Sequence, residues 1–144
     1  MISIILIAVS VFMTLRFYDR SYTRYTFAGL SLLIFTAQFI LKAPWLSSFY
    51  RAYIFLLIPF FIVNGLLTGT GLENPVVWYN HVQIVNVRVL TIPIEDFFYG
   101  MDLVLMNVIV YSLLAARIYK WRKNRRRPFH PIALSTYSKA NISA

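Results

Sequence analysis

Residues 52–72 read AYIFLLIPFFIVNGLLTGTGL, a run of 21 residues without a charged side chain. A helix needs about 20 consecutive apolar residues to cross the hydrocarbon core of a bilayer, so this stretch is long enough for one transmembrane helix. Pro59, Gly69 and Gly71 predict a kink or an early end of that helix near the glycines. The stretch therefore indicates a membrane protein.

The composition of the whole chain agrees with this interpretation. Of its 144 residues, 59% are hydrophobic and 13% are charged, whereas soluble domains have about 45–50% apolar and about 25% charged residues. The absence of cysteine excludes a disulfide framework, a thiolate metal site and a cysteine nucleophile. The formal charge is +9, but about half of that excess lies beside one hydrophobic segment, so we expect no binding of nucleic acid.

Three further hydrophobic segments accompany this run. Residues 1–15 are uncharged but short for a span, and predict a short or interfacial helix; a signal peptide is the alternative, although a basic start and a small-residue cleavage site are missing. Residues 25–41 and 97–116 also predict helices, and residues 73–94 an interfacial or re-entrant segment. We expect an all-α integral membrane protein, a bundle of three to four transmembrane helices with that segment before the last helix.

The basic residues predict the boundary and the orientation of the membrane module. Residues 1–119 are expected to form the module, and residues 120–144 a basic, disordered cytoplasmic tail. With four spans and a cytoplasmic C-terminus, ten of the 14 Lys and Arg residues lie inside, as the positive-inside rule favours. The expected location is the bacterial cytoplasmic membrane. The basic run after residue 116 is typical of a stop-transfer anchor. The more specific alternative is that it binds anionic lipid head groups.

Four of the five acidic residues fall between residues 73 and 102: Glu73, Glu95, Asp96 and Asp102. Ionisable side chains are costly in a hydrophobic bundle and are candidates for function. Pro93 predicts a helix start, where Glu95 and Asp96 complement the exposed N–H groups. Glu95, Tyr99 and Asp102 then share one helical face, which we expect to point inward or at a partner.

These residue types favour proton transfer. Two carboxyl groups close together in a dry site raise the pKa of one of them, and a neutral carboxylic acid can protonate a weakly basic carbon. Aromatic rings that line a cavity can stabilise a carbocation, and Asn64, which is buried in its span, should seek a hydrogen-bond partner. His81 and His130 do not have the spacing of metal ligands, and no dinucleotide or phosphate motif is present. We therefore expect no metal and no cofactor.

Three motifs in a fixed order are similar to a known family. They are IPFFIVNGLLTGTG at 58–71, ENPVVWYN at 73–80 and IPIEDFFYG at 92–100. From about Phe49 to Tyr119 the chain resembles the membrane-integral lycopene cyclase domain of heterodimeric and fused carotenoid cyclases, and within it the second, C-terminal-type module. The fused enzymes have two copies of the Pro-x-Glu-Glu/Asp motif and this chain has one. The resemblance thus implies a complementary module, as a partner subunit or as the rest of a longer protein.

The resemblance also implies a reaction and a set of residues. A carboxylic acid protonates the terminal double bond of lycopene, and the cation closes to a β-ionone ring without redox chemistry. Glu95 is expected to be the proton donor, with Asp96 or Glu73 tuning it or acting as base. Five residues are expected to shape the substrate pocket: Asn64, Trp78, Tyr79, Tyr99 and Asp102. Alternatives are a cyclase making ε or γ rings or acting on extended carotenoids, a non-catalytic membrane subunit that supports a partner, and a small transporter.

Overall fold

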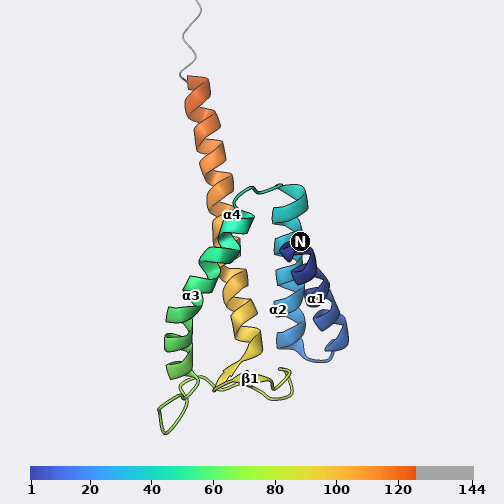
Figure 1. The fold of residues 1–144 in the computed structure, drawn as a ribbon, viewed down its shortest axis with the longest axis vertical. Coiled ribbons are helices and arrows are strands. Elements are labelled where there is room, and N and C mark those ends of the chain that lie inside the picture. Colours follow the sequence, from blue (N-terminus) through green and yellow to red (C-terminus); the bar gives the residue numbers. More distant parts are fainter. Residues whose placement is uncertain (126–144) are drawn as a thin grey trace, which may run out of the picture. The chain divides into compact units, whose positions relative to one another are not determined.

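The computed structural model describes residues 1–125 (Figure 1). The α-helices are α1 (Ile2–Arg16), α2 (Ser21–Phe35), α3 (Leu46–Leu67) and α4 (Ile94–Arg125), and a π-helical turn, η1 (Thr36–Ile40), continues α2. Two short strands, β1 (Arg88–Val89) and β2 (Ile92–Pro93), pair antiparallel with Arg88 opposite Pro93. The chain divides into two units, Met1–Val110 and the part from Tyr111 onward, and the buried core belongs to the first unit.

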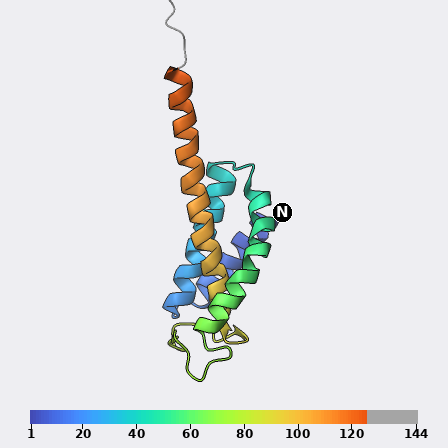
Figure 2. The same cartoon turned by 90° about the vertical axis from the view of Figure 1, so that its left-hand side faces the viewer.

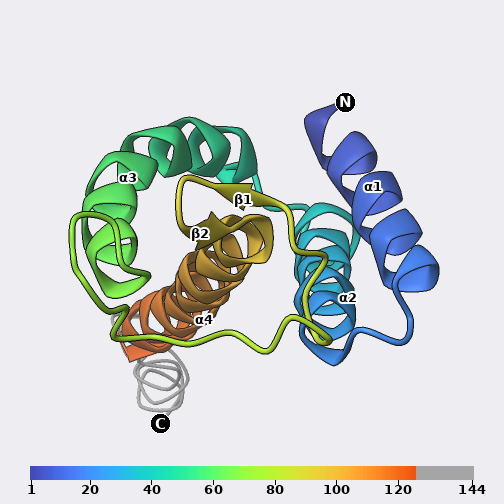
Figure 3. The ribbon, with the colours of Figure 1, turned by 90° about the horizontal axis from the view of Figure 1, so that it is seen from below.

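The direction of the helices brings distant residues to one end of the first unit. The chain runs one way through α2 and α4 and the opposite way through α3 (Figures 1 and 2). The start of α2, the end of α3 and the start of α4 therefore lie at the same end, where the α3–α4 loop and the hairpin also lie. Seen from that end, the start of α4 lies between α2 and α3 (Figure 3).

Glycine and proline set two of the helix boundaries at that end. α3 stops at Leu67, before Gly69 and Gly71, whose φ angles of 101° and 79° lie in the left-handed region. The predicted early end of this helix is thus confirmed. α4 begins at Ile94, directly after Pro93, whose ring fixes the backbone for a first helical turn. The predicted helix start is confirmed as well.

Buried apolar side chains join α2, η1, α3 and the first part of α4. They come from positions three or four residues apart, as expected for a helical face that packs inward. The buried cluster contains Leu30, Ile34, Ala37, Leu46, Phe49, Tyr50, Tyr53, Leu105 and Ile109. This core fixes the separation of α3 and α4, between which the candidate site lies.

The outer faces of the helices are apolar. α3 and α4 are long and apolar enough to cross a membrane, by length and composition, and α1 is apolar but shorter. Phe55 on α3 is 72% exposed and Ile58 is 62% exposed. Such surfaces suit lipid better than water. The prediction of a largely helical protein is confirmed, with α3 and α4 as candidate membrane spans, whereas the count of three to four spans stays a prediction.

Two parts of the chain differ from the predicted outline. The segment before the last helix consists of turns and the β1–β2 hairpin, which the sequence analysis did not predict, and its interfacial or re-entrant character stays a prediction. α4 continues as a helix to Arg125, past the predicted boundary at residue 120. The rest of the predicted disordered tail lies outside the described residues.

Candidate active site

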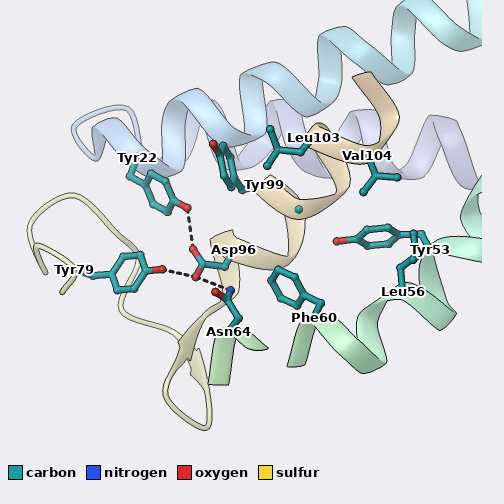
Figure 4. Close-up of a pocket in the computed structure, with 11 residues that line it drawn as sticks. Tyr22, Tyr53, Leu56, Phe60, Asn64, Tyr79, Asp96, Tyr99, Leu103 and Val104 are labelled. Atoms are coloured by element: carbon teal, nitrogen blue, oxygen red, sulfur yellow. Dashed lines mark hydrogen bonds between the residues drawn. The ribbon is translucent and has the colours of Figure 1, made fainter. Parts of the chain in front are cut away.

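Asp96 is the centre of a hydrogen-bonded cluster in the first turn of α4. Its side chain is 4% exposed. Tyr22 on α2 donates its hydroxyl to Oδ1 at 2.8 Å, and the Tyr79 hydroxyl from the α3–α4 loop donates to Oδ2 at 2.6 Å. Asn64 on α3 donates its amide to the same Oδ2 at 3.1 Å. Three elements therefore hold one carboxyl group, which Figure 4 shows at the centre of these side chains.

Glu95 points in a different direction and is fully buried, with 0% exposure. Its Oε1 accepts a hydrogen bond from the Thr23 hydroxyl at 2.7 Å and another from the backbone N–H of Val85 at 2.6 Å. Its Oε2 is buried and has no partner among the described residues. Arg20 also donates to the backbone carbonyl of Ile84. Glu95 and Arg20 thus fasten the α3–α4 loop to the start of α2.

A groove of about 460 Å³ extends from Asp96 between α3 and α4. We call it the Asp96 groove. Its polar groups gather at the Asp96 end, and the remainder of its wall is mainly apolar and aromatic. From Asp96 to Val104 it follows eight residues of α4, which corresponds to roughly 12 Å at the rise of an α-helix. The lining residues are Tyr22, Tyr53, Leu56, Phe60, Asn64, Tyr79, Asp96, Tyr99, Gly100, Leu103 and Val104.

The hydroxyl of Tyr79 is set up to remain a donor. Burial raises the pKa of Tyr79, and its hydrogen bond to the Asp96 carboxyl raises that pKa further. The phenol therefore keeps its proton at neutral pH and donates a hydrogen bond to the carboxyl oxygen. A donor of this kind favours the charged form of the carboxyl group as that group gives up a proton.

The structure brings together four of the residues predicted for the site: Asn64, Tyr79, Asp96 and Tyr99. Glu95 lies beside them in sequence, but its side chain is not part of the groove wall. Glu73 and Trp78 are exposed in the α3–α4 loop, with Trp78 at 77% exposure, and neither lines the groove. The roles predicted for these residues stay predictions.

Asp102 lies in a second cavity of about 370 Å³, which it lines with Ser21, Tyr22, Tyr25, Thr26, Gln83 and Tyr99. Its Oδ1 is buried without a partner among the described residues, and its Oδ2 lies 3.3 Å from the place where a Cβ on Gly29 would be. The predicted polar face of α4 is therefore turned inward at Glu95 and Asp102. Tyr99, on the same face, is 45% exposed.

Sequence reasoning did not identify several residues of this site. Tyr22 and Thr23 bind the two carboxyl groups from α2, and Tyr53, Phe60 and Gly100 form the middle of the groove wall. The chain contains 10 Tyr and 12 Phe, and nothing in the local sequence distinguishes these. The polar Ser21–Thr23 start of a helix beside an apolar segment is the one usable signal.

The cluster of groups is suited to proton transfer toward an apolar ligand. Within residues 1–125, no group of three or more His, Cys, Asp or Glu side chains is placed to hold a metal ion. The polar end of the groove instead presents one carboxyl group with three hydrogen-bond donors, next to apolar and aromatic walls. A carboxyl group placed in this way can exchange a proton with a carbon atom of a hydrocarbon that lies along the groove.

Comparison with known proteins identifies one family. The family model described as lycopene cyclase matches residues 19–114. The matched region contains α2, α3, the loop and the part of α4 that carries Glu95 and Asp96. The matched region begins 30 residues before Phe49, where the resemblance seen in the sequence begins, and so includes Tyr22 and Thr23. Comparisons with curated proteins and with solved structures gave no match.

Proposed function

Because this chain belongs to the lycopene cyclase family, as its motifs predict, we propose that it is one module of a carotenoid cyclase that closes the linear end group of lycopene to a β-ionone ring. The family supports a carotenoid cyclase role, and the details of the reaction are our proposal. The observation that carries it is the position of the Asp96 carboxyl at the polar end of an otherwise apolar groove. Lycopene is a hydrocarbon, so it fits the apolar wall and offers the carboxyl group only carbon atoms.

We propose that Asp96 donates the proton. Its carboxyl lines the groove, whereas the Glu95 carboxyl is enclosed by Thr23 and the loop backbone. As the proton leaves, negative charge develops on oxygens that accept hydrogen bonds from Tyr22, Tyr79 and Asn64, which lowers the barrier. Glu95, the donor that the family resemblance implies, is the alternative, and substitution of each carboxyl group in turn separates the two.

The proton balance of the reaction is closed by the same carboxyl group. The O–H bond of Asp96 breaks and its proton forms a C–H bond with the terminal alkene, leaving a tertiary cation. The π electrons of the neighbouring double bond form the ring bond. A C–H bond next to the new cationic carbon then breaks, its electrons form the ring double bond, and its proton returns to the Asp96 carboxylate. No proton is consumed, as an isomerisation requires.

A complementary module is part of this proposal. The chain has one copy of the acidic motif, at Pro93 to Asp96. Glu73 and Trp78 are exposed at the same end of the first unit as the groove. We propose that the complementary module covers this end, so that Glu73 and Trp78 contact substrate or partner there. Water is excluded by that contact, which protects the cation from being trapped.

The membrane setting follows from the same features. We propose an integral protein of the bacterial cytoplasmic membrane with its C-terminus in the cytoplasm, in which lipid surrounds the exposed faces of α3 and α4. Lycopene enters the groove from the lipid. The basic residues of α4 after position 116 are proposed to lie at the membrane surface, where they attract anionic lipid head groups.

Co-expression with the complementary module in lycopene-producing cells tests the proposal. The pair should produce cyclised carotenoid and this chain alone only lycopene. Asp96→Asn should abolish cyclisation, whereas Glu95→Gln, which keeps an acceptor for Thr23, should reduce it less. The opposite order would assign the donor to Glu95. A pair that yields only lycopene would exclude cyclisation of lycopene, and full activity of both variants would indicate a non-catalytic supporting subunit.

The ring type is read from the same extracts. Removal of the proton from a different carbon gives an ε or γ ring, so chromatography of the products distinguishes these from the β ring. The extended-carotenoid alternative is tested in cells that also make a longer linear carotenoid, where it predicts unconverted lycopene together with a cyclised longer product.

A further inference from the structure

We propose that Phe60 is a second catalytic residue, whose aromatic ring stabilises the carbocation formed on the substrate, and that Gly100 is the residue that positions this ring. The inference rests on the proposed cyclase function and extends it from the proton donor to the group that receives the developing positive charge.

The position of Phe60 is set by two helices. It lies one helical turn before Asn64 on α3, while Gly100 lies one turn after Asp96 on α4. Asn64 and Asp96 are hydrogen-bonded to each other, so the next turns of the two helices also face each other. A Cβ on Gly100 would lie only 3.1 Å from Cε2 of Phe60. The ring can therefore approach the α4 backbone this closely only because position 100 has no side chain.

The cation forms within reach of this ring. Asp96 protonates one carbon of the terminal double bond, and the positive charge appears on the adjacent carbon. The charge must therefore arise close to the carboxyl group. Gly100 and Phe60 lie one helical turn away from that group, which corresponds to about 5.4 Å of rise. Figure 4 shows the Phe60 ring beside Asp96 and Asn64 in the groove. An aromatic face attracts a cation and, unlike water, does not add to it.

The other aromatic residues of the groove are less suited to this role. The hydroxyls of Tyr22 and Tyr79 donate to the carboxyl group. The hydroxyl of Tyr53 donates to a backbone carbonyl of α4, and Tyr99 is 45% exposed. Phe60 is half-buried, carries no polar atom and lines the groove. Among the aromatic rings that line the groove, that of Phe60 is therefore the one without a hydroxyl group, and it presents only carbon atoms and a π face.

The chain supplies a matched control in the next residue. Phe61 is also half-buried, and both rings contact Phe97, with centroid distances of 5.4 Å for Phe60 and 4.8 Å for Phe61. Phe61 lines a different, almost wholly apolar pocket between α1, α3 and α4. A change in the electron density of the ring should therefore matter at Phe60 and not at Phe61.

Stepwise fluorination tests the assignment. Phenylalanine with one, two and three ring fluorines is incorporated at position 60 or 61, and kcat and KM for lycopene are measured with the complementary module in proteoliposomes. Fluorine weakens the π face with little change of shape. We expect log kcat to fall with each fluorine at position 60, by about 30-fold in total, which corresponds to a desolvated cation–π interaction of about 2 kcal/mol. KM should stay constant because lycopene is neutral, and position 61 should show no trend.

Each other outcome overturns the inference. A flat series at position 60, with cyclisation that is still lost in Asp96→Asn, would exclude the role of Phe60 and leave the proposed function intact. Equal decreases at both positions would indicate a packing effect and exclude it too. If a fluorinated protein does not assemble, Phe60→Leu and Phe60→Tyr replace it, since the tyrosine ring has the width of the phenylalanine ring: the inference requires a loss of kcat in the first and its retention in the second. A wild-type pair without any ring product would instead contradict the proposed function itself.

Discussion

Replacing Tyr79 by phenylalanine removes the hydroxyl that makes the shortest of the three hydrogen bonds to Asp96, at 2.6 Å. In the proposed mechanism Asp96 starts as a neutral acid, so this bond first joins two neutral groups, and such bonds contribute about 0.5–1.5 kcal/mol. As the proton leaves, the acceptor becomes a carboxylate, and bonds to charged groups contribute about 1.5–3 kcal/mol. The difference of about 1–1.5 kcal/mol is gained only on the way to the transition state, so we expect kcat to fall by about 5- to 13-fold.

The assay measures turnover of lycopene by the reconstituted pair, with the extracted pigments separated by chromatography. Tyr22→Phe should behave similarly, because the Tyr22 hydroxyl donates to the other Asp96 oxygen at 2.8 Å. Tyr18→Phe is the matched control, since Tyr18 is 63% exposed and is not part of the groove. Wild-type kcat in Tyr79→Phe, with Asp96→Asn inactive, would refute the reasoning that this bond strengthens during proton transfer.

Three further results are expected. Gly100→Ala places a methyl group 3.1 Å from both the Phe60 ring and the Tyr53 hydroxyl, so turnover should fall even though alanine favours a helix by about 1 kcal/mol; wild-type turnover would contradict the close packing. Glu95→Ala leaves the buried Thr23 hydroxyl and the part-buried Val85 amide without an acceptor; since a buried unsatisfied donor costs about 1–3 kcal/mol, the free energy of unfolding should fall by at least that amount in a detergent titration, and by less in Glu95→Gln. Because the pKa of Tyr79 is raised, its contribution to stability is full below the unfolded pKa of about 10 and is lost as the pH rises above that value. In Tyr79→Phe the free energy of unfolding should therefore decrease less steeply with pH above about 10. An unchanged dependence on pH would contradict this contribution of Tyr79.

The helices could be predicted from the sequence because each follows directly from a long apolar run or from a breaker residue. Gly69 and Gly71 marked the end of α3, and Pro93 marked the start of α4. The β1–β2 hairpin could not be found in this way. Its strands are two residues long, too short for the alternation of apolar and polar residues that identifies a strand.

Part of the site was predictable for a similar reason. Asn64 and Asp96 are polar groups in an apolar chain, and such groups stand out. The choice between Glu95 and Asp96 could not be made from sequence, because neighbouring residues on a helix point about 100° apart and only the packing of α2 and α3 shows which one faces the groove. Tyr22 and Phe60 reach the site through the pairing of helices that are far apart in the chain, and no local pattern reports that pairing.

The carboxyl of Asp96 receives hydrogen bonds from residues 74, 32 and 17 positions earlier in the chain. Tyr22 and Asn64 are therefore synthesised before Asp96, and in the proposed membrane setting they are inserted before α4 has left the ribosome. A polar side chain without a partner is costly in hydrocarbon, so the growing chain should remain beside the insertion machinery until Asp96 arrives. The proposed proton donor is then also the group whose arrival completes biogenesis, and a chain that ends before α4 should be degraded rather than accumulate.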